Sequence, residues 1–222
     1  MAKTSVITTS VQSAECSILK RMDDADRQRF EETLRAIAPL TGDDLASLVA
    51  ESVVQSLDAG AYFLHAGEHA SKAALVLDGV TRELWILEDG TTRTRSFAVE
   101  GELSGSLADL LSGKPSRSFI EALTDVRLAV VPWSSFDRLR NESPAWKSFS
   151  ARLAERLYVT KSEREYELIA LNAAARYERF RTRWPGLEAR VHQNVVASYL
   201  GVTPEHLSRV RRHARGPSQA RR

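Results

Sequence analysis

The stretch QNVVASYLGVTPEHLSRVRR, residues Gln193 to Arg212, is the most informative part of this sequence about its C-terminal end. Ala197 is a small residue where two helices must approach closely, and Gly201 follows where the chain must turn with a left-handed backbone. Thr203 then suits an N-cap, and Pro204 suits the first position of a second helix. The apolar positions that join the two helices are Val196, Leu200, Val202, Leu207 and Val210. The pattern predicts a helix-turn-helix, a motif whose second helix lies in the major groove of DNA.

An ordinary helical hairpin in a protein core is the alternative interpretation of this spacing. The outward face of the second helix argues against it, because that face is polar and basic. It carries Glu205, Ser208, Arg209, Arg211 and Arg212. Residues 176–222 contain eleven Arg and three Glu, a net charge of +8 in a chain whose total is +2. A basic C-terminal module on an acidic body indicates a polyanionic partner for that end, and double-stranded DNA fits both observations.

The whole sequence excludes several other classes of protein. Its 222 residues suffice for one large or two modest domains, and 43% hydrophobic with 27% charged residues is an ordinary globular composition. A single cysteine, Cys16, excludes an internal disulfide framework and a four-thiolate iron–sulfur cluster within one chain. Neither a membrane-spanning apolar run nor a signal-peptide core occurs, so we expect a cytoplasmic protein with no membrane partner. Five His residues without metal-ligand spacing, and no Gly-rich phosphate loop, indicate no catalytic or metal site and no enzyme.

The first part of the chain changes its apolar period from helices to strands. After a polar lead-in, Phe30, Leu34, Ile37 and Leu40 keep helical spacing, and residues 41–44 open a second short helix. Short apolar runs then follow at 53–57, 62–64, 73–77, 83–87, 92–97, 118–123 and 126–131. Gly60, Gly67, Gly79 and Gly90 separate the first of these runs, and Asp89-Gly90 is a strong hairpin signal. The pattern predicts a closed antiparallel roll or barrel.

Ser143-Pro144 starts the longest predicted helix, which runs to about Asn172. At 1.5 Å per residue it spans roughly 40 Å, too long for one small roll to cover. It packs either on its own domain or against a second copy, and the near-heptad spacing of its apolar residues favours the second copy. The predicted dimer interface is Trp146, Phe149, Leu153, Leu157 and Leu168. Beyond this helix, residues 187–191 are predicted as a short strand.

A roll, a long helix and a helix-turn-helix in this order resemble the Crp/Fnr family of bacterial transcription regulators over about residues 30–215. The corner at residues 77–82, Asp89-Gly90-Thr91 and the segment 176–180 add to the resemblance. The family implies an α+β fold with a roll like a cyclic-nucleotide-binding domain and flanking helices. It also implies a homodimer on an inverted DNA repeat, with RNA polymerase as a further candidate partner. The predicted domains are a variable lead-in (1–24), a sensory β-roll (25–142), a dimerisation helix (143–172) and a helix-turn-helix domain (173–222).

In Fnr-like members the recognition helix reads DNA with a Glu followed three and four residues later by Ser-Arg. Glu205, Ser208 and Arg209 match that spacing. Arg209 can bond guanine O6 and N7, Glu205 can accept from cytosine N4, and Ser208 suits thymine. Cyclic-AMP-dependent members carry a further Arg where this sequence has Pro204, so the guanine that such an Arg reads is not expected in the operator. The predicted phosphate contacts are Arg190, His192, Gln193, Thr203, Arg211 and Arg212.

The family's nucleotide-binding stretch can be aligned in two registers. Gly101-Glu102-Leu103 copies its first residues, but the Arg-Ser pair at 117–118 then lies too far away. Aligning Gly105 with the motif glycine keeps the loop length and is preferred, because pairing fixes strand lengths in a roll. The predicted pocket residues are then Gly105, Ser106, Ser116 and Arg117. This register lacks the ribose-binding carboxylate, so cyclic nucleotide is disfavoured as a ligand and no cofactor is predicted.

The family often places a β-hairpin wing after the recognition helix. Here residues 211–215 run directly into Gly216-Pro217, which ends the helix. We therefore expect the wing to be reduced or absent.

Overall fold

The computed structural model describes residues 19–214, and the expectations for the lead-in before residue 19 and for the wing lie outside these residues. A two-residue strand, β1 (Leu19–Lys20), precedes α1 (Asp24–Arg35) and α2 (Gly42–Glu51). Asp23 caps α1 by accepting a hydrogen bond from the Asp26 amide at 2.8 Å. Thr41 and Asp44 form a capping box at the start of α2, as the sequence predicts for a helix start there.

The strands form a two-sheet antiparallel roll that confirms the predicted fold class. They are β2 (Val53–Leu57), β3 (Tyr62–Leu64), β4 (Lys72–Asp78), β5 (Thr81–Ile86), β6 (Thr92–Ala98), β7 (Leu103–Ser104), β8 (Phe119–Ala122) and β9 (Val126–Pro132). One sheet has the order β1-β2-β9-β4-β7 and the other β3-β8-β5-β6. A short helix, α3 (Leu107–Ser112), lies between β7 and β8. Strands β1 and β7 and helix α3 were not predicted, because they are too short to show a period in the sequence.

Strand β4 reads as a continuous apolar run because both of its faces are covered. Leu75 and Leu77 belong to the core beneath the helices, whereas Ala74 and Val76 belong to the core between the sheets. At the corner after β4, a Cβ on Gly79 would lie 2.3 Å from the Asp125 carbonyl oxygen, and φ there is +92°. This corner therefore requires glycine.

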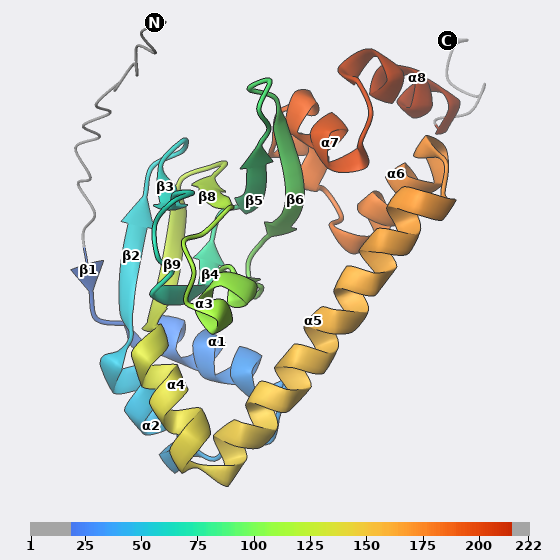
Figure 1. The fold of residues 1–222 in the computed structure, drawn as a ribbon. Helices are drawn as coiled ribbons and strands as arrows, with labels where there is room; N and C mark the ends of the chain where they lie inside the picture. Colours follow the sequence, from blue (N-terminus) through green and yellow to red (C-terminus); the bar gives the residue numbers. More distant parts are fainter. Residues whose placement is uncertain (1–18, 215–222) are drawn as a thin grey trace, which may run out of the picture.

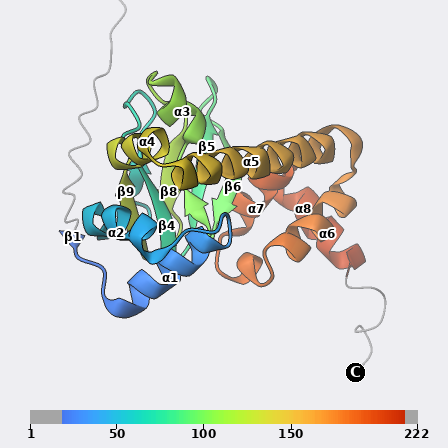
Figure 2. The same cartoon turned by 90° about the horizontal axis from the view of Figure 1, so that it is seen from below.

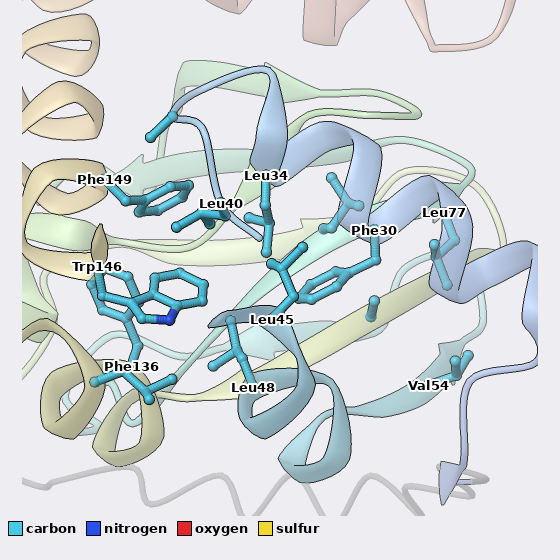
Figure 3. Packing of buried hydrophobic residues seen from close by; sticks show 14 residues of the cluster. Phe30, Leu34, Leu40, Leu45, Leu48, Val54, Leu77, Phe136, Trp146 and Phe149 are labelled. Carbon is cyan, nitrogen blue, oxygen red and sulfur yellow. The ribbon is translucent and has the colours of Figure 1, made fainter. Parts of the chain in front are cut away.

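Helices α1, α2 and α4 (Trp133–Glu142) and the start of α5 (Pro144–Ala170) form a base under the first sheet (Figure 1). Figure 3 shows Phe30, Leu45, Trp146 and Phe149 converging there from three helices. The Trp146 indole N–H donates to the Asp44 carbonyl oxygen at 3.0 Å, which ties α5 to α2. We call this apolar cluster the helical base.

Beyond the helical base α5 leaves the roll, and α6 (Ala173–Arg183), α7 (Gln193–Leu200) and α8 (Pro204–Ala214) gather at its far end (Figure 2). The predicted strand at 187–191 is wrong: Leu187–Ala189 is a turn of 3-10 helix. Gly186, with φ +78°, turns the chain so that Leu187 enters the core of this module, and the segment pairs with no strand of the described chain. No helix among residues 19–214 is both long and apolar enough to cross a membrane.

A candidate nucleic-acid interface

The turn between α7 and α8 has the geometry that its sequence predicts. Gly201 ends α7 with φ +68°, and the Val202 amide donates to the Ala197 carbonyl oxygen at 3.0 Å. The Thr203 side chain accepts from the His206 amide at 3.2 Å and so caps α8. The two helices meet on Val196, Ala197 and Leu207, all fully buried. Their packing fixes α8 relative to α7 and leaves its other face to solvent.

The exposed face of α8 carries the three residues predicted to read bases. Glu205, Ser208 and Arg209 are all exposed. The amide of Glu205 itself, the Thr203 hydroxyl and the charge of Arg209 lower the pKa of the Glu205 carboxyl, which keeps it an ionised acceptor. Arg209 makes no ion pair or side-chain hydrogen bond within residues 19–214, so its guanidinium is available for a ligand.

Gln193, at the start of α7, connects the two helices at this face. Its side-chain amide donates to the Ser208 hydroxyl and to the Pro204 carbonyl oxygen, both at 2.9 Å. Arg211 donates to the Gln193 side-chain oxygen at 3.3 Å and lies 3.9 Å from the Glu188 carboxylate. The structure thus brings Gln193, Ser208 and Arg211 together, and the Ser208 hydroxyl accepts a hydrogen bond from Gln193.

The other predicted phosphate contacts differ in their surroundings. His192, Thr203 and Arg212 are exposed near the helix starts or on α8. Arg190 is engaged by the roll: its guanidinium forms two hydrogen bonds with the Glu100 carboxylate, at 2.6 and 2.8 Å. Sequence reasoning missed this contact, because the two residues are 90 positions apart and nothing in either segment indicates the other.

The helix-turn-helix module is docked on strand β6 of the roll. The Ser198 hydroxyl accepts from the Thr94 amide and donates to the Thr92 carbonyl oxygen, both at 2.9 Å. The Trp184 indole N–H donates to the Glu102 carboxylate at 3.1 Å. We call this contact the docking seam, which comprises Thr92, Thr94, Phe97, Glu100 and Glu102 of the roll and Phe180, Trp184, Arg190, Ser198 and Tyr199 of the module.

Glu102 is the carboxylate that the less favoured register would have assigned to a ribose. Its carboxylate also accepts from the Val99 amide of the roll, at 3.1 Å, so it is engaged by both the roll and the module. Of the four residues predicted for a pocket, Ser106 and Ser116 are buried. The Ser116 hydroxyl donates to the Asp109 carboxylate at 2.6 Å, and Arg117 is exposed.

A cavity of about 900 Å³ separates the roll from α5. Gly105 lines it, whereas Ser106, Ser116 and Arg117 do not, so the four predicted pocket residues do not surround one space. Its walls include the apolar Leu153 and Leu157 and the basic Arg95 and Lys161. Burial, and then the charge of Arg95, lower the pKa of the Lys161 ammonium.

The five α5 residues predicted as a dimer interface lie in different environments. Trp146 and Phe149 are 1% and 2% exposed inside the helical base, so their assignment to the interface is wrong. They complete the core of their own roll, and no partner can reach them. Leu153 and Leu157 line the cavity, and Leu168 approaches Gly201.

A different set of apolar side chains on α5 faces solvent. It consists of Tyr158, Val159, Tyr166 and Ile169, exposed by 73%, 59%, 51% and 78%. Tyr158, Val159 and Tyr166 do not line the cavity, whereas Ile169 also borders it at the distal end of the helix. The spacing of seven between Val159 and Tyr166 is the sequence signal that could have identified this face.

Residues 54–143 match the family model of the cyclic nucleotide-binding domain. The structure is similar to FixK2 from Bradyrhizobium japonicum, with 21% identity, 74% of this chain and 86% of that chain covered, and a TM-score of 0.63. It is similar to CLP from Xanthomonas campestris, a c-di-GMP-responsive global regulator, with 17% identity, 82% and 96% coverage and a TM-score of 0.62. A candidate Crp/Fnr regulator from Eubacterium rectale shares 15% identity, with 81% and 88% coverage and a TM-score of 0.64. No curated protein sequence matches this chain.

Proposed function

We propose that this chain, which has the cyclic nucleotide-binding domain and the overall fold of the Crp/Fnr regulators, is a homodimeric, sequence-specific DNA-binding transcription regulator of the cytoplasm. The observation that carries the proposal is the exposed face of α8. There Arg209 is exposed, Gln193 holds Ser208 in place, and the Thr203 hydroxyl interacts with the Glu205 carboxylate. A helix hairpin with only a structural role has no need of such a face.

The chemistry of this face fits base edges in a major groove. The Arg209 guanidinium matches guanine O6 and N7, the Glu205 carboxylate accepts from cytosine N4, and Ser208 contacts thymine. Each half-site would then contain a TTGA-like core. Thr203, Gln193 and Arg212 flank this face and supply phosphate contacts, which fix position without reading sequence. Arg211 is half-buried and bonded to Gln193, so it orients that contact.

The exposed apolar face of α5 supports pairing with a second copy. Tyr158, Val159, Tyr166 and Ile169 extend over the distal half of the helix. Pairing there would place two α8 helices in successive major grooves, about 34 Å apart, on an inverted repeat. The roll (25–142), the helix (143–172) and the basic module (173–222) would then sense, dimerise and bind DNA respectively.

Selection from random duplexes tests DNA reading directly. The wild type should enrich an inverted repeat with TTGA-like arms. Arg209→Ala should lose roughly 1–3 kcal/mol of binding free energy per arm and relax the preference at the guanine. Arg212→Ala is the matched control on the same helix: it should weaken all duplexes about equally and reduce the salt slope by about 0.9 per lost phosphate contact. Unchanged base preference in Arg209→Ala would remove Arg209 from the reading role.

Sedimentation tests the dimer. Ile169→Asp places a charge in the proposed helix pair and should cost about 3–5 kcal/mol of association free energy, leaving monomers. Ser148→Asp is the control. Ser148 is exposed on the same side of α5, but in the proximal half of the helix, outside the apolar cluster. A dimer that survives Ile169→Asp lies on another surface.

Ligand sensing is a second candidate function, favoured by the cavity between the roll and α5. Its walls combine apolar leucines with Lys161 and Arg95, which suits an anionic molecule with an apolar part. Glu102, which the less favoured register assigns to the ribose, lines this cavity, but its carboxylate already accepts from Val99 and Trp184, so cyclic AMP and cyclic GMP should bind weakly or not at all. Titration calorimetry with both nucleotides checks this, and a stoichiometric sub-micromolar heat from either would contradict it.

A further inference from the structure

We propose that Glu100 of the roll is an internal competitor for DNA, occupying the Arg190 guanidinium that would otherwise hold a phosphate. Docking on the roll and full engagement of DNA are then mutually exclusive. This inference rests on the proposed DNA-binding function and adds its regulation.

The Glu100–Arg190 contact reproduces the geometry of an arginine–phosphate pair. Both terminal nitrogens of Arg190 bond to different oxygens of Glu100, at 2.6 and 2.8 Å. A phosphate offers the same two-oxygen edge, so the guanidinium cannot satisfy both partners at once. Glu100 is itself held in place, because its carboxylate accepts from the Gly79 amide at 2.9 Å, at the corner that requires glycine. The Arg190 guanidinium holds the pKa of Glu100 at about 2, so the competitor is charged at neutral pH.

Arg190 belongs to the part of the module where phosphates are expected. It lies two residues before His192, the N-cap of α7, and Gln193 of that helix bonds to Ser208 on the reading face. Amides at a helix N-terminus and a nearby guanidinium together favour an anion. In the docked structure the anion beside Arg190 is a carboxylate of the same chain.

The roll also lies against the start of the recognition helix. A cavity of about 280 Å³ separates Thr92 and Arg93 of the roll from Asn194, Thr203 and Pro204 of the module. The docked roll therefore borders both helix starts. Release of the seam would free Arg190 and widen the approach to these positions.

An ordinary surface ion pair is the alternative explanation, and such pairs contribute little on their own. The Glu100–Arg190 pair differs from an ordinary surface ion pair in two ways. It links the roll to the helix-turn-helix module, and it engages an arginine that is expected to bind a second ligand, a DNA phosphate. The Glu51–Arg138 pair is a suitable ordinary example. Its N–O distance is 2.6 Å, its side chains are 42% and 43% exposed, and it lies between α2 and α4 of the helical base.

The test is Glu100→Gln in the full-length protein, with Glu51→Gln as the matched control for loss of one negative charge. Glu100→Gln should bind the selected operator duplex about fivefold more tightly or better, whereas Glu51→Gln should change affinity less than about twofold. Amide hydrogen exchange without DNA should accelerate in residues 92–102 and 190–200 of Glu100→Gln, and not in the control. An affinity gain no larger than that of Glu51→Gln would overturn the proposal.

A second variant isolates the mechanism. Arg190→Gln removes the contested guanidinium, so adding Glu100→Gln to it should change DNA affinity no further. An undiminished gain in that background would show that Glu100 acts by general repulsion and would overturn the competition. If no variant binds any selected duplex while exchange at the seam still rises in Glu100→Gln, the DNA-binding function itself fails and the competition falls with it. Unchanged exchange together with normal DNA binding would overturn the competition alone.

Discussion

The roll is covered on two sides, and the two contacts are built differently. In the helical base, Phe30, Leu45, Trp146 and Phe149 are at most 2% exposed, and the indole–carbonyl bond of Trp146 is the only hydrogen bond among them that reaches another helix (Figure 3). In the docking seam, one roll side chain, Phe97, lies among three rings of the module at centroid distances of 5.3 to 6.0 Å. Hydrogen bonds of Glu100, Glu102 and Ser198 surround these rings.

This difference separates a domain interior from an interface. The base has the continuous apolar packing of a single core. The seam has a buried aromatic anchor surrounded by polar contacts, which is the usual anatomy of a contact between separate proteins. We infer that the base is permanent, whereas the seam can open without unfolding either side. Three substitutions test this distinction, and they follow in decreasing order of expected effect.

Phe149→Ala tests the base. Removing a fully buried phenyl ring should reduce the free energy of unfolding by about 3–5 kcal/mol, because the cavity can collapse only partly. Urea denaturation followed by circular dichroism measures this loss. Lys147→Ala, exposed on the same turn of α5, should change stability by less than about 0.5 kcal/mol. An equally small effect of Phe149→Ala would mean that α5 is not part of the roll's core.

Phe97→Ala tests the seam. As an interface anchor it should cost about 2–4 kcal/mol of docking free energy. Hydrogen exchange should then accelerate in α7 and β6 while amides of α1, α2 and β4 stay protected. Trp85→Ala is the control, because Trp85 lies on the neighbouring strand and is 41% exposed. Parallel loss of protection in the helical base would show that base and seam form one cooperative unit.

Local signals in the sequence predicted much of this structure. The seven strand runs, the helix start at Thr41 and the Gly201–Thr203 turn each depend on a few neighbouring residues, and all are confirmed. The resemblance to the Crp/Fnr family is confirmed at the level of fold and domain.

The predictions that failed concern residues whose contacts are with partners distant in the sequence. A heptad stripe shows that Trp146 and Phe149 are buried but not against which surface, and the roll rather than a second copy covers them. Likewise, apolar periodicity at 187–191 could not distinguish a strand from a turn fixed by Gly186. The seam joins residues up to 106 positions apart through single hydrogen bonds, for which the sequence has no periodic signal.

The smallest of the three effects concerns the charge in the seam. Arg190 lowers the pKa of the Glu100 carboxyl from its usual 4.5 to about 2. A carboxyl whose pKa is lowered by docking stabilises the docked state fully above pH 4.5 and loses that contribution as the pH falls toward about 2. The contribution should be modest, because Glu100 is 33% exposed and solvent screens the pair.

Comparing seam exchange in wild type and Glu100→Gln at the same pH isolates this contribution, since intrinsic exchange rates then cancel. The difference between the two proteins should be equal at pH 7 and pH 5 and should shrink below pH 4.5. A difference that already disappears near pH 6 would show that a group other than the Glu100 carboxyl controls the seam. A difference that persists unchanged at pH 3 would show that the charge of the Glu100 carboxylate is not what distinguishes the two proteins at the seam.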